Sequence, residues 1–372
     1  MSTSILSADA VRRALSIRDL TDPAQGPHAL QQLVDACVRR LAETWGSAAR
    51  VHRASPIVSI ADNYDRLRYP AGGGARDARY TRYVCDVALL RTQTSSMIPP
   101  LLGRLAEGEA IGDVLLACPG LVYRRDSIDR LHTGEPHQLD LWRVTEGARL
   151  STDDLRTMIG VVVDAVLPGR EWRTLAAEHP YTIAGLQIDV RDGASWVEIG
   201  ECGLAHPELL STSGLRDCSG LAMGLGLDRL LMLRKGMEDI RLLRAQEPRI
   251  ASQMLDLSPY RAVSSMPPVR RDLSIVVHHS VTPEELGDRV RAALGDRADA
   301  IEGVEVAAET PYASLPPSAR SRLRLAPHQK NVLVRVVLRD LTRTLTHGEA
   351  NELRDAIYAA VHDGEVDEWA AR

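Results

Sequence analysis

Two arginines stand in strand-like stretches rich in small residues, where they could bind phosphate. Arg124 lies in GLVYRRD and Arg229 lies in GLGLDRL. Arginine suits this role because its planar guanidinium group bonds phosphate oxygens in pairs. Activation of a carboxylate by ATP needs such cations, together with acids for Mg²⁺ and polar groups for a substrate amine, all fixed around an in-line attack. Either arginine alone is more typical of an ordinary surface position.

The composition is that of an ordinary globular protein. Apolar residues make up 44% of the 372 residues and charged residues 26%. No apolar run approaches the roughly 18–20 residues that span a membrane. The start of the sequence, MSTSILSADAVRRAL, lacks the apolar stretch and cleavage site of a secretory signal. We therefore expect a cytosolic protein with no membrane partner.

The cysteines give no indication of a metal site or a disulfide framework. They are widely scattered, without a CxxC pair and without a histidine at ligand spacing. We expect them to be small buried apolar residues. They are Cys37, Cys85, Cys118, Cys202 and Cys218.

The net charge of −5 is not typical of a nucleic-acid-binding protein, because phosphate contact needs clustered Lys and Arg. A local basic patch stays open as an alternative. The chain has two lysines, Lys235 and Lys330, and no phenylalanine. Basic and aromatic roles therefore fall almost wholly to Arg, Tyr and Trp.

The elements that position these residues follow from the spacing of apolar side chains. A chain of this length predicts two domains, since a domain commonly holds roughly 100–200 residues. Apolar residues at helical spacing predict a helix over 28–45. Residues 57–71 read as a strand and a loop, and 80–91 alternate as a strand does. The glycine triplet 72–74 between them predicts a turn, and it is no phosphate loop because no helix follows.

The middle of the chain reads as strands with one long polar connection. Residues 118–144 predict two antiparallel strands joined by a charged loop in which chemistry is expected. A helix is predicted over 151–167, with Ser151 and Asp154 in a capping pattern. Residues 183–190 and 195–206 are strand-like, and 220–236 predict a strand that leads into a helix at Leu227.

After a stretch rich in Ser, Pro and Arg near Ser258, the pattern changes. Residues 273–279, 304–310 and 331–340 read as strands, and 282–294 and 346–361 read as helices. This order predicts a ferredoxin-like βαββαβ unit or a near variant of it. We place the domain boundary near Ser258.

Several stretches resemble one known family in the same order. VYRRDSIDRLHTGEPHQLD resembles motif 2, and GLAMGLGLDRLLML resembles motif 3, of bacterial phenylalanyl-tRNA synthetase α subunits. DNYDRLRYPAGGGARDARYTRY, LLRTQTS and SWVEIGECGLAHPELL match the same family, so that the resemblance covers roughly residues 60–257. It implies an α+β fold, in which a class II synthetase antiparallel sheet is flanked by helices.

The resemblance also implies the domain organisation. Residues 1–50 would form an N-terminal helical segment and 51–257 the class II catalytic domain. Residues 258–372 resemble the ferredoxin-fold anticodon-binding domain, fused to the core as in single-chain organellar enzymes. Class II cores commonly pair while the organellar relatives are monomers, so both a monomer and a homodimer stay open.

Roles in ATP binding follow from the resemblance. Arg124 would hold the α-phosphate and the substrate carboxylate, and Arg229 would bind the γ-phosphate and cover the adenine. Asp126 falls where the family places an acid near the adenine edge. His132 falls where a loop histidine approaches the phosphates, although by itself it is more typical of a surface loop.

Roles in binding the metal and the amino acid are implied in the same way. Glu198 matches a family acid that bridges Mg²⁺ and phosphate oxygens, and Mg²⁺ prefers such oxygen ligands. Glu201 is a candidate for a second ligand. Each amino-acid-binding candidate alone would be an ordinary strand-end residue. Those candidates are Gln93, Ser95, Gln138, Asp140, His179, Tyr181 and Ala222.

The sequence departs from the family where the substrate side chain would bind. The family usually has Phe-Pro-Phe, whereas this chain has His179, Pro180 and Tyr181. A polar ring in an apolar site is costly unless it is hydrogen-bonded, so His179 indicates a different substrate side chain. Pro136 replaces a phenylalanine that usually stacks on adenine. Loss of phenylalanine throughout the chain is the plainer explanation, and it covers Tyr181 but not the other two.

A stripe of cations in the C-terminal part could contact a tRNA backbone. In the span from 320 to 343 the only acid is Asp340. A solvated strand face is the alternative. The candidate tRNA-binding residues are Arg320, Arg322, Arg324, Lys330, Arg335 and Arg343, with Arg339 in the same stripe.

Three functions fit the sequence. The first is a single-chain ligase that activates phenylalanine or a related amino acid with ATP and Mg²⁺ and transfers it to tRNA. The second is a paralogue that activates a different amino acid for a biosynthetic pathway, as His179, Ile183 and Pro136 suggest. The third is a tRNA-binding protein without catalysis, which Pro136 and Asp140 would favour if they disable the site.

Overall fold

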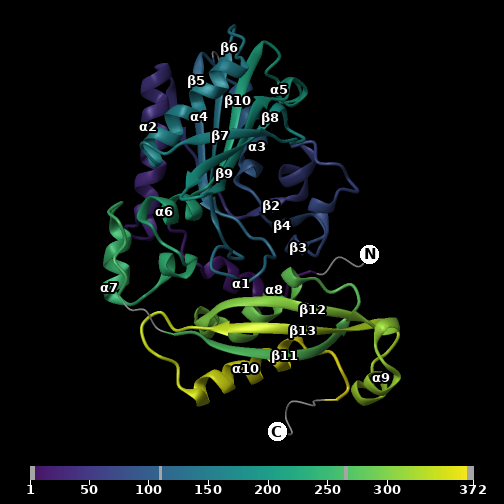
Figure 1. The fold of residues 1–372 in the computed structure, drawn as a ribbon. Coiled ribbons are helices and arrows are strands. Elements are labelled where there is room, and N and C mark those ends of the chain that lie inside the picture. The colour runs from purple at the N-terminus through teal and green to yellow at the C-terminus, as the bar shows by residue number, and fades with distance from the viewer. Residues whose placement is uncertain (1–4, 109–110, 264–266, 367–372) are drawn as a thin grey trace. The chain divides into compact units, whose positions relative to one another are not determined.

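The computed structural model describes residues 5–108, 111–263 and 267–366, and its elements are labelled in Figure 1. The chain forms two compact units. Unit 1 contains Met1–Arg124, Glu135–Met237 and Ser252–Tyr260; unit 2 contains Arg125–Gly134, Glu238–Ala251 and Arg261–Arg372. Each unit therefore combines separate stretches of the sequence. Residues 1–50 belong to unit 1, and two short segments from the predicted catalytic part belong to unit 2.

Unit 1 is built on a seven-stranded sheet with strand order β1-β5-β6-β10-β9-β8-β7. The β1 and β5 strands are parallel, and every other neighbouring pair is antiparallel. The predicted antiparallel sheet of an α+β fold is thereby confirmed. The strands are β1 (Ala48–Val51), β5 (Asp113–Leu121), β6 (His137–Glu146), β7 (Trp172–Ala176), β8 (Thr182–Asp192), β9 (Ser195–Ala205) and β10 (Cys218–Gly226).

Helices α2 (Ala29–Trp45) and α4 (Thr152–Val166) lie side by side along the sheet (Figure 1). Both were predicted from the sequence. Five apolar residues of the stripe that predicted the first helix are buried in α2: Leu30, Leu33, Val34, Cys37 and Leu41. The helix ends where Gly46 adopts a left-handed φ of 64°. The α4 helix begins with the predicted capping pair, in which Ser151 and Asp154 bind each other's backbone N–H groups.

A second apolar layer contains α3 (Ile98–Ala106) and α5 (Pro207–Thr212). Alternate residues of β5, among them Leu116, pack with α3 and with Trp142, whose side chain is fully buried. Ala222 of β10 lies in the same layer. The sheet beneath the predicted amino-acid site therefore rests on a closely packed apolar core.

The stretch 80–91 is not the single strand that its alternation predicted. It forms two short strands that pair as a hairpin, with the chain turning at Asp86 and Val87 between them. This hairpin belongs to a small sheet of order β2-β4-β3. Its strands are β2 (Ile57–Ser59), β3 (Tyr83–Cys85) and β4 (Ala88–Leu90); α1 (Ala8–Ser16) and α6 (Leu227–Lys235) complete the longer elements of unit 1.

Gly200 lies where two strands of the large sheet approach closely. A Cβ atom at this position would stand 2.2 Å from the carbonyl oxygen of Gly224 on β10. We expect Gly200→Ala to lower the free energy of unfolding by about 1–3 kcal/mol, because the strands must move apart. Gly103→Ala is the matched control, since Gly103 lies in a helix with no atom near the added methyl group. Urea denaturation of both variants measures the difference, and equal stabilities would contradict the proposed close packing.

Unit 2 contains a three-stranded antiparallel sheet of order β11-β13-β12. Helices α8 and α10 pack with its apolar side chains. The order matches three strands and both helices of a ferredoxin-like unit. Among the described residues no fourth strand follows α10, although Asp363 N–H donates to Val276 O of β11 at 2.7 Å. The elements are α7 (Pro248–Ala251), β11 (Val269–His278), α8 (Pro283–Leu294), β12 (Ile301–Pro311), α9 (Pro317–Leu323), β13 (Gln329–Leu338) and α10 (His347–Val361).

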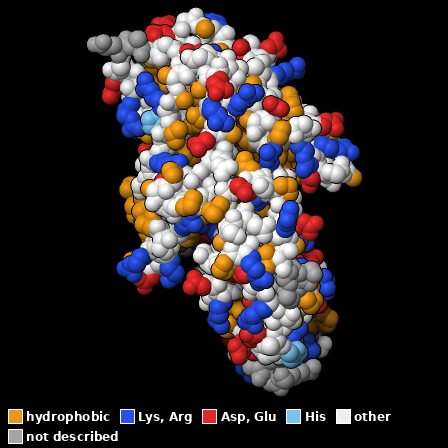
Figure 2. All heavy atoms as spheres, turned by 90° about the vertical axis from the view of Figure 1, so that its left-hand side faces the viewer, with side chains coloured by type: hydrophobic (Ala, Val, Ile, Leu, Met, Phe, Trp, Pro, Cys, Tyr) orange, Lys and Arg blue, Asp and Glu red, His pale blue; other side chains and the backbone are white. Residues whose placement is uncertain are grey.

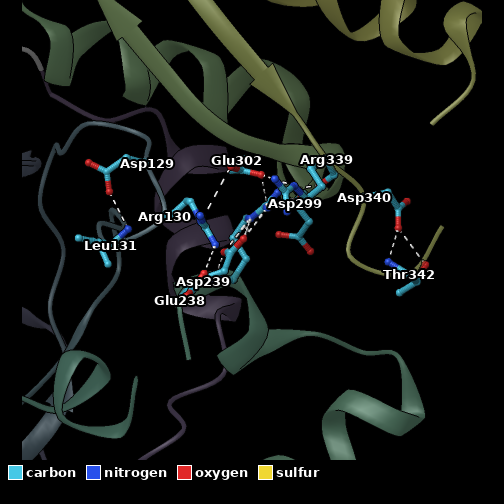
Figure 3. Close-up of polar contacts among 11 residues, drawn as sticks. Asp129, Arg130, Leu131, Glu238, Asp239, Asp299, Glu302, Arg339, Asp340 and Thr342 are labelled. Atoms are coloured by element: carbon cyan, nitrogen blue, oxygen red, sulfur yellow. Dashed lines mark hydrogen bonds and ion pairs between the residues drawn. The ribbon is translucent and has the colours of Figure 1, made fainter. Parts of the chain in front are cut away.

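Two segments from earlier in the sequence are held in unit 2 by charged side chains (Figure 3). Arg241 donates to the carbonyl oxygens of Asp299 and Arg339, at 2.9 Å each. Glu302 of β12 forms an ion pair with Arg339 at 2.5 Å and lies 3.9 Å from Arg130 of the 125–134 loop. Glu302 is 8% exposed. Removal of Arg339 or Arg130 would leave the buried Glu302 carboxylate with fewer cations, so these ion pairs help to hold the two segments in unit 2.

Positive and negative side chains are interspersed on the face seen in Figure 2, without a dominant patch of one sign. None of the helices in the described part of the chain is long and apolar enough to cross a membrane.

Candidate active site

Arg124, Glu198 and Arg229 are brought together in unit 1 from three separate stretches of sequence. Arg124 follows β5 and donates through Nε to the carbonyl oxygen of Thr92 at 2.9 Å. Arg229 lies in the first turn of α6, and its Nη1 donates to the carbonyl oxygen of Glu198 on β9 at 2.9 Å. Each of these bonds uses only part of the hydrogen-bonding capacity of its guanidinium group, and both arginines are partly exposed. Both arginines therefore keep donors available for a further partner.

The Glu198 carboxylate lies in the field of both arginines and of a second acid. Burial and repulsion from Glu201 raise the pKa of Glu198, while Arg229 and Arg124 oppose the rise. A divalent cation beside Glu198 would relieve this repulsion.

Glu201 is engaged by one of the residues that replace the family's phenylalanines. His179 Nε2 lies 2.9 Å from Glu201 Oε2. The hydrogen bond from His179 lowers the pKa of Glu201 below its ordinary value, and Arg124 contributes in the same direction. The His179 side chain is 9% exposed. The sequence did not predict this pairing, because an acid on β9 and a histidine before β8 share no local pattern.

Ser95 and Asp140, both predicted to bind the substrate amine, contact each other directly. Ser95 Oγ donates to Asp140 Oδ2 at 2.6 Å, and Trp142 Nε1 donates to Oδ1 at 2.9 Å. Asp140 is 3% exposed. Burial raises the pKa of this carboxyl group, although the hydrogen bonds from Ser95 and Trp142 act against the rise. An ammonium group beside Asp140 would compensate its buried charge.

Gln93 and Gln138 complete this polar group. Gln138 Oε1 accepts the backbone N–H of Thr94 at 3.3 Å. Gln93 donates to the carbonyl oxygen of Asn63 at 3.0 Å and accepts the hydroxyl of Tyr69 at 3.0 Å. Asn63 is fully buried in a π-helical turn, Ala61–Asp65. Sequence reasoning missed Asn63 and Tyr69, although both lie within DNYDRLRYP, the first matching block.

Aromatic rings surround the predicted side-chain site. The ring centroid of Tyr181 lies 6.1 Å from that of Trp142, 6.3 Å from Tyr69 and 6.1 Å from His179. Ala222 lies opposite Trp142 in the pairing of β10 with β6. Burial raises the pKa of the Tyr181 phenol well above its ordinary value. The set combines aromatic faces with polar ring atoms.

Two of the predicted ATP-binding residues belong to unit 2. His132 Nδ1 lies 2.7 Å from Asp129 Oδ2, and Asp126 Oδ1 accepts the backbone N–H of Ser127 at 2.9 Å. The loop that carries them is fixed by Arg291, which donates to the carbonyl oxygens of Asp126 and Ser127 at 2.7 Å each. Pro136 belongs to unit 1, where its carbonyl oxygen accepts Val122 N–H at 2.9 Å.

Several cations of the predicted stripe pair with acids outside the span considered from the sequence. Arg335 binds Asp272 through two bonds of 2.9 Å. Arg343 binds Glu349 through bonds of 2.9 and 2.8 Å. Lys330 is 8% exposed and binds Glu309 and the carbonyl oxygen of Val281 at 2.8 Å each. Burial of Lys330 leaves it little surface for an external phosphate.

The remaining candidates lie around α9. Arg320 donates to two backbone carbonyl oxygens at 2.8 Å and lies over the Tyr312 ring. Arg322 belongs to α9, and Arg324 ends the helix with a left-handed φ of 45°.

The five cysteines are free thiols, and their burial differs. Three are buried, Cys218 is partly exposed and Cys85 is exposed. The prediction of buried residues is therefore wrong for Cys85, which ends an edge strand of the small sheet. Within the described ranges no group of three or more His, Cys, Asp or Glu side chains could by itself hold a metal ion.

Comparison with known proteins was made for the whole chain. The sequence profile described as "tRNA synthetases class II core domain (F)" matches residues 22–254. The chloroplastic/mitochondrial phenylalanine–tRNA ligase of Arabidopsis thaliana is 26% identical over 319 residues, covering 82% of this chain and 68% of that protein. The phenylalanine–tRNA ligase alpha subunit of Prochlorococcus marinus (strain MIT 9313) is 31% identical over 239 residues, covering 63% and 69%. A probable mitochondrial phenylalanine–tRNA ligase of Drosophila melanogaster is 25% identical over 368 residues, covering 83% and 76%.

Proposed function

The chain belongs to the family of class II tRNA synthetase core domains, and on this premise we propose that it activates an amino acid with ATP and transfers it to tRNA. The observation that carries the proposal is the convergence of Arg124 and Arg229 on Glu198. The relatives that match most of the chain are phenylalanine–tRNA ligases. Phenylalanine or a related amino acid is therefore the first substrate to test.

In the proposed reaction, the carboxylate of the amino acid attacks the α-phosphate of ATP and pyrophosphate leaves. Arg124 stabilises the charge that develops on the α-phosphate, and it is fixed beside the 92–95 segment that carries Ser95. Arg229 binds the γ-phosphate and covers the adenine. Pro136 of the same unit is a further proposed contact with ATP.

Mg²⁺ would be held by Glu198 together with phosphate oxygens. The raised pKa of Glu198 fits this role, because its carboxylate lies beside a second acid and gains from a cation. Glu201 is the weaker candidate, since it is bound to His179. A bound Mg²⁺ supplies charge neutralisation of the phosphates, and few protein ligands suffice because Mg²⁺ keeps water and phosphate oxygens around it.

The amino acid would bind with its ammonium group beside Asp140, Ser95, Gln138 and Gln93. Its side chain would then lie near Tyr181, Ala222 and His179. The buried Asp140 carboxylate fits an ammonium partner because the two charges compensate each other.

One observation favours the alternative that a different amino acid is activated. His179, which is paired with Glu201, places a hydrogen-bonding ring where the family has an apolar one. A site built to pair a polar substrate group rejects an analogue that lacks the group. The protein would then be a paralogue that supplies an activated amino acid to a biosynthetic pathway.

We expect His179→Phe to shift the preference toward phenylalanine. The ratio of kcat/KM for phenylalanine to that for the best polar amino acid should rise by about 10-fold or more, because the substituted ring removes a polar contact and adds an apolar one. Pyrophosphate exchange with each amino acid measures the ratio. His206→Phe is the matched control, because His206 caps α5 on the surface. A fall in phenylalanine use by His179→Phe would show that His179 is not in the amino-acid site.

We also propose that tRNA is the acceptor and that 258–372 form the anticodon-binding domain after a catalytic domain at 51–257. The arginines at 320, 322, 324, 335 and 343 are the proposed backbone contacts. Paired arginines can still bind phosphate, since each guanidinium group has several donors. The test is charging of total tRNA with the activated amino acid. A protein that forms the adenylate but charges no tRNA would support the biosynthetic alternative.

A further inference from the structure

Asp228 directly precedes Arg229 in the chain and binds His137 at the start of β6. The side chain of His137 has no exposed surface, and that of Asp228 is 7% exposed. Oδ1 of Asp228 lies 2.8 Å from His137 Nδ1. Its Oδ2 accepts the backbone N–H of the same histidine. One buried carboxylate thus fixes both the main chain and the ring of His137.

The partners of the ring define its protonation. Leu20 N–H donates to His137 Nε2 at 3.1 Å, so Nε2 carries a lone pair. Nδ1 therefore carries the proton and donates it to Asp228. In the other tautomer, the Nε2–H group of His137 would point at the N–H group of Leu20. These partners leave the ring a single allowed orientation.

The first turn of α6 depends on this contact. Gly226 precedes the helix and provides no side-chain cap. Asp228 ties the turn to β6, and Arg229 reaches the carbonyl oxygen of Glu198 on β9. Successive residues of a helix point about 100° apart, since a turn holds 3.6 residues. Asp228 is buried for this reason, while Arg229 lies on the partly exposed side.

We propose that Asp228 and His137 are positioning residues for Arg229. They hold the first turn of α6 so that the guanidinium group of Arg229 meets the phosphates of ATP in one orientation. This inference rests on the proposed phosphate role of Arg229. Neither residue needs to contact ATP, and the contact joins positions 91 residues apart in sequence.

Two substitutions of His137 separate its two hydrogen bonds. In His137→Asn, the amide Nδ2–H can replace the Nδ1–H donor toward Asp228, and the acceptor for Leu20 is lost. In His137→Gln, the amide oxygen can replace Nε2 as the acceptor for Leu20, and the donor toward Asp228 is lost. Each variant lacks one buried hydrogen bond of the same ring, and the bond to the Asp228 carboxylate is the stronger of the two.

We measure the Kd for ATP with Mg²⁺ by titration calorimetry and the kinetics of pyrophosphate exchange. His137→Gln should raise the Kd about 10-fold and lower the exchange kcat/KM for ATP about 100-fold, because a displacement near 1 Å has such an effect. His137→Asn should stay within about 3-fold of wild type. In an Arg229→Lys background, His137→Gln should add less than about 3-fold, since both changes act through one residue. Asp228→Asn should show the same loss as His137→Gln and replaces it if that variant does not fold.

Equal Kd values for ATP in His137→Gln and His137→Asn would overturn the inference. So would an equally large effect of His137→Gln in the Arg229→Lys background as in the wild type. The result is separate from the proposed function. Wild-type protein that binds ATP but gives no pyrophosphate exchange with any amino acid would contradict the proposed function. In that case, a higher Kd for ATP in His137→Gln but not in His137→Asn would still support the positioning role. Exchange in the wild type with unchanged ATP binding in His137→Gln would contradict the positioning role alone.

Discussion

Replacement of Arg124 by alanine is expected to lower amino-acid-dependent pyrophosphate exchange by about 1,000-fold or more without unfolding the protein. The guanidinium group of Arg124 donates to Thr92 O at 2.9 Å, next to the segment that carries Ser95. A group that stabilises transition-state charge on a phosphate commonly contributes factors of about 10³–10⁵. Loss of kcat should therefore exceed the rise in the KM for either substrate.

The control for this prediction is Arg170→Ala. Arg170 is a partly exposed arginine of the same unit that forms an ion pair with Asp192 at 2.8 Å. The Arg170→Ala variant should catalyse pyrophosphate exchange at nearly the wild-type rate, because a partly exposed ion pair contributes little to stability. Arg229→Ala should abolish exchange as Arg124→Ala does. Normal exchange in either active-site variant would refute its phosphate role.

Asp140→Ala is expected to raise the KM for the amino acid by about 100-fold and to lower the melting temperature. The change removes the buried acid that we assign to the substrate ammonium. It also leaves the Ser95 hydroxyl and the Trp142 N–H without their acceptor, and unpaired buried groups cost about 1–3 kcal/mol each. Exchange kinetics and thermal denaturation measure the two effects separately.

Asp113→Ala controls for loss of stability alone. Asp113 lies on β5 of the same sheet and binds Arg143 and Ser47, away from the proposed substrate contacts. This variant should melt at a lower temperature with an unchanged KM for the amino acid. If Asp140→Ala behaved in the same way, Asp140 would be a structural residue and the ammonium site would lie elsewhere.

Regular elements were predictable wherever the chain repeats one pattern for long enough. The α2 helix was found from its buried stripe, and the strand-to-helix transition into α6 from its glycines and apolar run. The hairpin at 83–90 was read as one strand because its strands are only three residues each. Alternation over such short stretches does not reveal a turn.

The candidate site was predictable only as far as the motifs extend. They identified Arg124, Glu198 and Arg229, which the structure brings together. Contacts between distant stretches were missed, among them His179 with Glu201 and His137 with Asp228. Each member is an ordinary residue in its own segment, and the pairing arises from strand order. Membership of the 125–134 loop in unit 2 was hidden for the same reason.

The basic stripe shows how a count along the sequence can mislead. Asp340 was the only acid in the span, yet Arg335 and Arg343 bind acids from β11 and α10. Cross-strand register sets the first of these pairs, since Asp272 lies opposite Arg335. The local net charge of a folded surface therefore depends on pairing that spacing does not reveal.

Amino-acid-dependent exchange of pyrophosphate into ATP, measured with wild-type protein and each standard amino acid in turn, tests the central claim most directly. We expect Mg²⁺-dependent exchange with phenylalanine or with one related amino acid, and loss of that exchange in Arg124→Ala and Arg229→Ala. Absence of exchange with every amino acid, from folded protein, would contradict the assignment of Arg124, Glu198 and Arg229 as an amino-acid-activating centre.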